Sequence, residues 1–319
     1  MRKILALVLC LIMAVSCIPA MAEEAAAVKT GLCFEVSNTT GRGGAGYQTN
    51  ILLAGVTVDD NGVIDACAFD YVQAKTAIDE NGVITTDKAI SFESKQELGD
   101  GYAMRAASSI SAEWNEQANA FAAFCVGKTL EEVKAAEQNE NGQIVDIITT
   151  CTLEAGEFLP ALEAAVTNAA HLGAKKGDTL KLGQYSVLGA ANDATAEADG
   201  KLQVYTHAGV ITLNGETITS AYIDASQANI TFNCKGETTS DLAAEILTKN
   251  ELKEGYGMKA IFPIGKEWYE QAAGFCAFIT GKTVAEAIVI AGNPAETDVI
   301  ATCTIGIGDF QKLLVKAAQ

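Results

Sequence analysis

The chain has little histidine and little positive charge. It holds two histidines, His171 and His207, and 22 basic residues against 40 acidic ones, for a formal net charge of −18. Since the histidines do not recur in the repeat described below, zinc sites with two or more His are not expected, and any Ser-His-Asp or Cys-His site would belong to one half only. Both histidines are predicted to be ordinary surface or loop residues. The deficit of positive charge argues against nucleic acid and anionic membranes as partners.

A complete phosphate-binding loop is also missing. Gly127–Thr129 and Gly281–Thr283 read Gly-Lys-Thr, as such loops end. The loop requires an earlier glycine, five positions back, where the chain has Ala122 and Cys276. The two triplets are therefore predicted to mark helix ends, where glycine adopts the left-handed conformation.

After the N-terminus no apolar stretch is long enough to span a membrane. The chain starts with the basic Met1–Lys3, continues apolar over Ile4–Val15 and reaches a small-x-small site ending at Ala22. These are the three parts of a secretory signal, here assigned to residues 1–22. Cys17 offers an alternative, a lipoprotein-type cleavage with a lipid anchor. Both routes predict an extracytoplasmic protein, secreted or attached to the cell surface.

A duplication is the strongest internal pattern. Lys95–Val133 and Lys249–Ala287 align without a gap, and roughly half of the positions are identical. A length of 319 residues with 49% hydrophobic content suits two packed domains. The predicted organisation is repeat 1 at 30–168, a linker at 169–180 and repeat 2 at 181–319.

Each copy is predicted to be α+β, a small and mostly antiparallel sheet with helices packed on it. Asn61-Gly62 predicts a tight hairpin between short β-prone runs. Apolar residues then recur at helical spacing from Trp114 to Cys125, and again from Trp268. Thr129 with Glu132, and Thr283 with Glu286, predict capping boxes of further helices. A last strand is expected at Val145–Leu153, before a helix from about Glu157.

Cysteines and carboxylates leave two questions open. Of nine cysteines, Cys10 and Cys17 precede residue 23, so seven remain. Cys125–Cys151 and Cys276–Cys303 could form parallel disulfides, or all four could be buried thiols. Two Glu-x-x-Glu pairs suggest paired carboxylates, but a solvated helix face is the preferred interpretation; they are Glu113 with Glu116 and Glu267 with Glu270.

The most informative motif comes directly before the last helix of each copy. Asp146, Thr149 and Thr152 stand at three-residue intervals, and Asp298, Ala301 and Thr304 repeat the frame. This arrangement resembles the attachment motif of the FMN-binding domain family, in which the final threonine carries FMN through a phosphoester bond. The resemblance implies FMN as cofactor and assigns its site to the hydroxyl and acidic residues of the two motifs: Asp146, Thr149, Thr152, Asp298 and Thr304.

The motif also departs from that family. Thr150-Cys151 and Thr302-Cys303 replace a small Gly-Ala-like pair, and Ala301 replaces a hydroxyl residue. The whole repeat is also similar to an exported, membrane-immunogen-like lipoprotein domain of gut Firmicutes.

Two functional hypotheses follow. In the first, the protein is an extracellular flavin carrier for electron transfer, with a membrane redox partner and a flavin transferase that loads it. In the second, it is a non-enzymatic surface module that has lost flavin, with residues shared by the copies lining a groove, such as Tyr102 and Tyr256 or Gln73 and Gln227.

Overall fold

The computed structural model describes residues 25–41, 46–291 and 302–319. The elements follow each other in a similar order twice. In the first half they are β1 (Lys29–Thr40), β2 (Tyr47–Val58), β3 (Ile64–Thr76), β4 (Ser91–Phe92), α1 (Lys95–Leu98), η2 (Gly99–Tyr102), α2 (Trp114–Cys125), α3 (Leu130–Lys134), η3 (Val145–Ile147) and α4 (Ala155–Thr167). In the second half they are β5 (Thr179–Asn192), β6 (Gly200–Asn214), β7 (Thr217–Phe232), α5 (Lys249–Leu252), η4 (Lys253–Tyr256), α6 (Trp268–Ile279), α7 (Val284–Ile288) and α8 (Gly308–Ala317). β4 and η3 have no counterpart among the described residues of the second half.

The predicted α+β class is confirmed. One antiparallel sheet has the order β1-β2-β3 and the other the order β4-β5-β6-β7. The predicted hairpin joins β2 to β3, with Gly62 at φ 80°. The Asp59 carboxylate holds this turn by accepting from the backbone N–H groups of Asn61 and Val63, at 2.8 and 2.9 Å.

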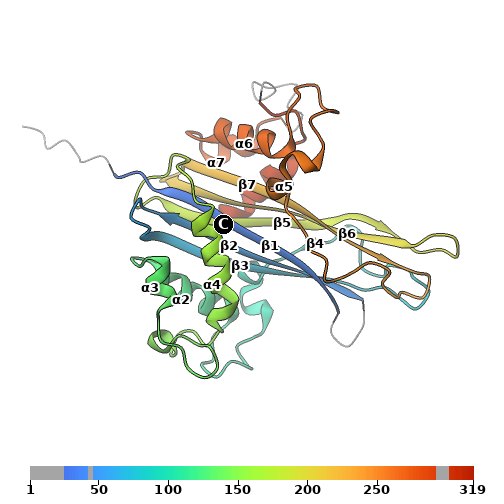
Figure 1. Ribbon diagram of the computed structural model, residues 1–319, viewed down its shortest axis with the longest axis horizontal. Helices are drawn as coiled ribbons and strands as arrows, with labels where there is room; N and C mark the ends of the chain where they lie inside the picture. The colour runs from blue at the N-terminus through green and yellow to red at the C-terminus, as the bar shows by residue number, and fades with distance from the viewer. Residues whose placement is uncertain (1–24, 42–45, 292–301) are drawn as a thin grey trace, which may run out of the picture.

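The molecule has four layers, two sheets face to face with helices on each outer face. Apolar side chains of both sheets meet between them, among them Leu53 and Val72 from the first and Val204 and Val210 from the second. The outer faces carry two further cores, one under α2 and α4 and one under α6 and α8. Figure 1 shows α2 and α3 on one side of the strands and α5, α6 and α7 on the other.

The two halves are tied together by exchange as well as packing. β4 belongs to the first half but pairs with β5 of the second, Phe92 opposite Ser186. Thr30 and Ser220 share a buried hydrogen bond of 2.7 Å between the sheets. Lys316 forms an ion pair with Glu97 at 2.8 Å. The first half therefore supplies an edge strand to the sheet of the second half.

The helix predictions hold and one strand prediction is wrong. Both capping boxes form, with Thr129 and Thr283 at the N-caps of α3 and α7, and Gly127 and Gly281 have positive φ after α2 and α6. The strand expected at Val145–Leu153 is instead the short 3₁₀ helix η3 followed by turns. The N–H groups of Thr150 and Cys151 both bond to Ile147 O at 2.8 Å, so these backbone donors are satisfied within the segment instead of by a neighbouring strand.

The solvated-face interpretation of the glutamates is wrong for one member of each pair. Glu113 is 2% exposed and Glu267 is 3% exposed. The Glu113 carboxylate accepts from the N–H groups of Met104 and Arg105, at 2.8 and 2.9 Å. Each buried glutamate thus fixes the loop that leads into α2 or α6.

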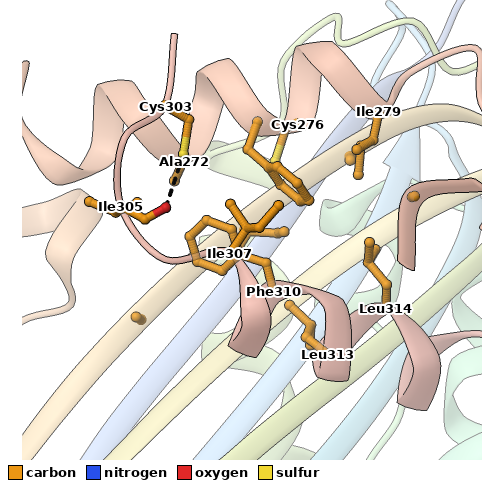
Figure 2. Packing of buried hydrophobic residues seen from close by; sticks show 14 of the residues in the cluster. Ala272, Cys276, Ile279, Cys303, Ile305, Ile307, Phe310, Leu313 and Leu314 are labelled. Atoms are coloured by element: carbon orange, nitrogen blue, oxygen red, sulfur yellow. Dashed lines mark hydrogen bonds between the residues drawn. The ribbon is translucent and has the colours of Figure 1, made fainter. Parts of the chain in front are cut away.

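All seven cysteines beyond residue 22 are free thiols in the structure, so the disulfide hypothesis is not supported. Figure 2 shows Cys276 and Cys303 among the buried apolar side chains around α6 and α8, where the Cys303 thiol donates to Ile305 O at 3.8 Å. Cys125 interacts with Cys67 of β3. The pKa of the Cys67 thiol is raised well above its ordinary value, first by burial and then by Cys125.

Candidate functional site

The two threonines assigned to flavin attachment serve a structural role. The N–H and hydroxyl of Thr152 both donate to Oε1 of Gln117, at 2.8 and 3.0 Å. Thr304 bonds to Gln271 in the same way, at 2.8 and 3.1 Å. Both glutamines are 0% exposed. Thr152 therefore links α2 to the start of α4, and Thr304 links α6 to the segment before α8.

The other motif residues of the first half do not bond to Thr152, whose N–H and hydroxyl are both bonded to Gln117. Asp146 and Thr149 are exposed on and after η3, and Asp298 lies outside the described residues. Neither Thr152 nor Thr304 lines the two cavities described below. A phosphoester would need a free threonine hydroxyl beside open space, so the residues present do not fit a covalently attached FMN.

The structure instead gathers a different set of residues around Lys95, the first residue of α1. Its Nζ lies 4.4, 4.6 and 5.0 Å from the ring centroids of Tyr71, Tyr102 and Trp114. These are cation–π distances, at which the ring quadrupoles stabilise the ammonium. We call Lys95 with its three rings the first cage.

The second half repeats this arrangement around Lys249, the first residue of α5. Its Nζ lies 4.7, 4.6 and 5.0 Å from the ring centroids of Tyr205, Tyr256 and Trp268. It also donates to the Tyr205 hydroxyl at 2.7 Å. We call this set the second cage.

A buried aspartate positions each caged lysine. Asp70 on β3 accepts from the N–H of Gln96 at 3.2 Å, and Asp224 on β7 accepts from the N–H of Asn250 at 3.0 Å. These bonds hold the first turn of α1 and of α5, where the lysines lie. Burial raises the pKa of both carboxyls to about 6, although the hydrogen bonds they accept act in the opposite sense.

Burial also changes the acidity of the lysines. The pKa of Lys95 and of Lys249 is lowered to about 8, mainly because each ammonium is removed from water. Both remain mostly charged at neutral pH. In each half an ammonium is therefore held by aromatic faces, half-buried at Lys95 and buried at Lys249.

A cavity of about 400 Å³ adjoins the second cage. This volume lies within the range of about 300–1,000 Å³ typical of small-molecule sites. Its apolar wall includes Met258, Ile261 and Phe262, and Ile261 is 80% exposed. Its charged groups are Lys249 and Asp309.

His207 on β6 also lines this cavity, and the prediction that it is a surface or loop residue is wrong. It is 3% exposed, and its ring packs against Tyr205 and Phe310 at 4.5 and 5.6 Å. Its Nδ1 is buried and has no hydrogen-bond partner in the described part of the chain. Burial lowers the pKa of His207 to about 3, so the ring is neutral at physiological pH. His171, in contrast, is exposed beside Asp60, as predicted.

A larger cavity of about 820 Å³ lies between the halves, beside the first cage. Its lining includes Phe34–Asn38 of β1 and Leu242–Leu247 of the second half. Lys95 and Trp114 of the first cage also line it. Of the shared residues expected in a groove, Gln73 lines this cavity and Tyr256 the smaller one, whereas Tyr102 and Gln227 line neither.

The sequence repeat indicates three of the four residues of each cage. Lys95, Tyr102 and Trp114 fall on Lys249, Tyr256 and Trp268 in the ungapped repeat. Nothing in the spacing showed that a tyrosine of the sheet completes each set.

No group of three or more His, Cys, Asp or Glu suited to a metal was found in residues 25–41, 46–291 and 302–319. Within the same ranges no helix has the length and apolarity to cross a membrane. Comparisons with protein-family models, with curated proteins and with solved structures gave no match.

Proposed function

We propose that the protein is a non-enzymatic binding module whose second-half cavity takes a small apolar molecule bearing a carboxylate. Two observations carry this proposal: His207 lines the cavity, and its buried Nδ1 has no hydrogen-bond partner among the described residues. Leaving a buried polar atom unsatisfied costs about 1–3 kcal/mol. A ligand atom that bonds to it would remove this cost.

The charges of the cavity favour a carboxylate as the polar group of the ligand. Lys249 donates to a tyrosine hydroxyl, and no carboxylate of the described residues forms an ion pair with it. Asp309, the acidic group of the cavity, is bonded to Lys312 at 3.1 Å. A ligand carboxylate would therefore supply the counter-charge of the buried ammonium, in a charge-assisted hydrogen bond.

The walls favour an apolar body. Met258 and Phe262 line the cavity, and the exposed Ile261 extends the apolar surface outward. Apolar walls with a few converging polar groups are typical of ligand sites. The proposed setting is extracytoplasmic, which depends on the signal assigned to residues 1–22.

Binding can be followed through Trp268, which lies in the cavity wall. The chain has two tryptophans, so Trp114→Phe leaves Trp268 as the single tryptophan, which can be excited selectively over tyrosine. In this background, 3-phenylpropionate and 3-phenylpropionamide are titrated separately. We expect the acid to change the Trp268 emission and to bind at least about tenfold more tightly than the neutral amide.

The chain itself provides the matched control for this titration. Lys249→Met and His207→Phe should each weaken binding of the acid by about tenfold, whereas Lys95→Met, the equivalent change in the first half, should not. Equal affinity for acid and amide would refute the carboxylate assignment. Equal effects of Lys95→Met and Lys249→Met would refute the site.

A further inference from the structure

The strand β1 has a free edge where it faces the larger cavity. Thr30 directs its backbone away from β2, since its N–H and C=O bond to Ala170 at 2.8 and 3.0 Å. Backbone direction alternates along an antiparallel pair, so Phe34 and Val36 also direct their N–H and C=O groups away from β2. No other backbone group of the described residues bonds to them. The edge that lines the cavity, Phe34–Asn38, spans roughly 13 Å at about 3.3 Å per residue.

The second half shows what such an edge accepts. There the edge of β5 is covered by β4, which pairs antiparallel through Ser91 and Phe92. The repeat equates these two residues with Glu245 and Ile246. Glu245 and Ile246 line the cavity opposite β1 but form no strand. The cavity therefore occupies the place where the second half has a paired strand.

The charge of the cavity indicates which strand would fit. The carboxylates of Glu35, Glu157, Glu245 and Glu251 line it, against the single ammonium of Lys95, which the first cage surrounds. All four glutamates are exposed to solvent. Their combined field attracts positive charge and disfavours acidic partners.

We propose that this cavity binds an extended peptide with basic side chains, which adds as a strand to the free edge of β1. The backbone bonds of Phe34 and Val36 would give affinity, and the surrounding glutamates would select lysine or arginine at alternate positions. This site is separate from the carboxylate-binding cavity of the second half.

The probe is a fluorescein-labelled seven-residue peptide in which lysine alternates with valine and threonine, measured by fluorescence anisotropy on the full chain. We expect binding that weakens steeply with salt. A peptide with glutamate in place of lysine should not bind measurably. Glu35→Gln with Glu245→Gln should weaken binding about fivefold to tenfold, whereas Glu197→Gln with Glu216→Gln, exposed and outside the cavity, should not.

Two further measurements separate strand addition from simple charge attraction. N-methylation of alternate peptide amides should abolish binding when the methyl groups face β1 and be tolerated in the other register, because only the first removes the pairing N–H groups. Bound peptide should also slow hydrogen exchange at the amides of Phe34 and Val36. Equal binding of both N-methylated peptides, or unchanged exchange at these amides, would overturn the proposal.

Discussion

In the first half the ring that completes the cage comes from β3, as Tyr71. In the second half the equivalent position on β7 is Ala225, and the ring comes from β6, as Tyr205. The residue paired with this position on the neighbouring strand differs as well. Leu52 is opposite Tyr71 in the first half, and His207 is opposite Ala225 in the second. Both halves thus keep the caged lysine, but the tyrosine that the sheet contributes comes from a different strand in each. In the second half this difference is accompanied by a buried histidine in the cavity wall.

The two halves also differ at the edges of their sheets. The second half has a covered edge, with β4 on β5, whereas the first half leaves β1 open against a cavity. The smaller cavity therefore adjoins the cage of the second half, and the larger cavity borders the open edge of β1. We infer that duplication preserved the lysine cages and that divergence gave each half its own binding surface.

The largest expected effect comes from removing a central ring of either core. Phe158 packs against Phe69 and Phe121 at 5.0 and 5.1 Å, and Phe310 packs against Phe275 at 5.3 Å. Phe158→Ala and Phe310→Ala should each lower the free energy of unfolding by about 3–5 kcal/mol, measured in guanidinium.

The fluorescence of the two tryptophans reports whether the loss of stability affects both halves of the protein. Trp114 lies 6.1 Å from Phe158 and Trp268 lies 5.7 Å from Phe310. Because both sheets share one core, single-tryptophan versions of either variant should show coincident transitions. A Phe158→Ala variant that shifts only the Trp114 transition would show that the halves unfold separately.

The buried aspartates give the next largest effect, which depends on pH. Their pKa is raised from 3.8 to about 6, so each adds stability that is complete below pH 3.8 and is lost as pH rises through 6. Asp70→Asn and Asp224→Asn replace the carboxyl with an amide that does not ionise, so these variants do not lose this stability as the pH rises. Between pH 4 and 7 the free energy of unfolding of each variant should therefore rise relative to wild type, by up to about 3 kcal/mol.

Urea denaturation at several pH values measures this difference. The caged lysines do not interfere, because their lowered pKa of about 8 lies above the window. The exposed Asp146→Asn is the control and should parallel wild type. A constant difference between Asp70→Asn and wild type across the window would contradict the prediction.

Removing one hydroxyl tests the difference between Tyr205 and Tyr71, and its expected effect on stability is smaller. Lys249 donates to the Tyr205 hydroxyl at 2.7 Å, whereas no such bond joins Lys95 and Tyr71. Tyr205→Phe should therefore cost about 1.5 kcal/mol of stability, and Tyr71→Phe less than about 0.5 kcal/mol. Equal costs in thermal or urea denaturation would show that the hydroxyl of Tyr205 does not distinguish the cages.

Thiol reactivity separates the exposed cysteine from the buried ones. Cys234 is exposed, while burial raises the pKa of Cys33 and Cys276 to about 12. In the native protein a thiol reagent should label Cys234 first, and Cys234→Ser should remove this fast phase. Unfolding without reductant should expose all seven thiols beyond residue 22; a lower count would establish disulfides.

The last prediction is that a flavin transferase has no effect on the mass of the protein. Because the hydroxyls of Thr152 and Thr304 are bonded to buried glutamines, co-expression with a flavin transferase should leave the intact mass unchanged. An FMN-sized gain that disappears in Thr152→Val with Thr304→Val would restore the electron-carrier hypothesis.

Local signals carried much of the fold. Asn61-Gly62 predicted the β2–β3 hairpin, the spacing from Trp114 predicted α2, and Thr129 with Glu132 predicted the start of α3. Each depends on backbone preferences within a few residues. Val145–Leu153 was missed because a β-prone sequence forms a strand only where a partner edge is available, which is a property of the assembled sheet.

The sequence by itself determined the repeat, the α+β class and the positions of Lys95 and Lys249, because these follow from patterns within a segment or from self-alignment. Only the tertiary structure decided that Tyr71 and Tyr205 complete the cages from different strands, that His207 is buried without a partner, and that β1 keeps a free edge. These features depend on which distant segments pack together, since burial and pairing arise only when the two sheets meet.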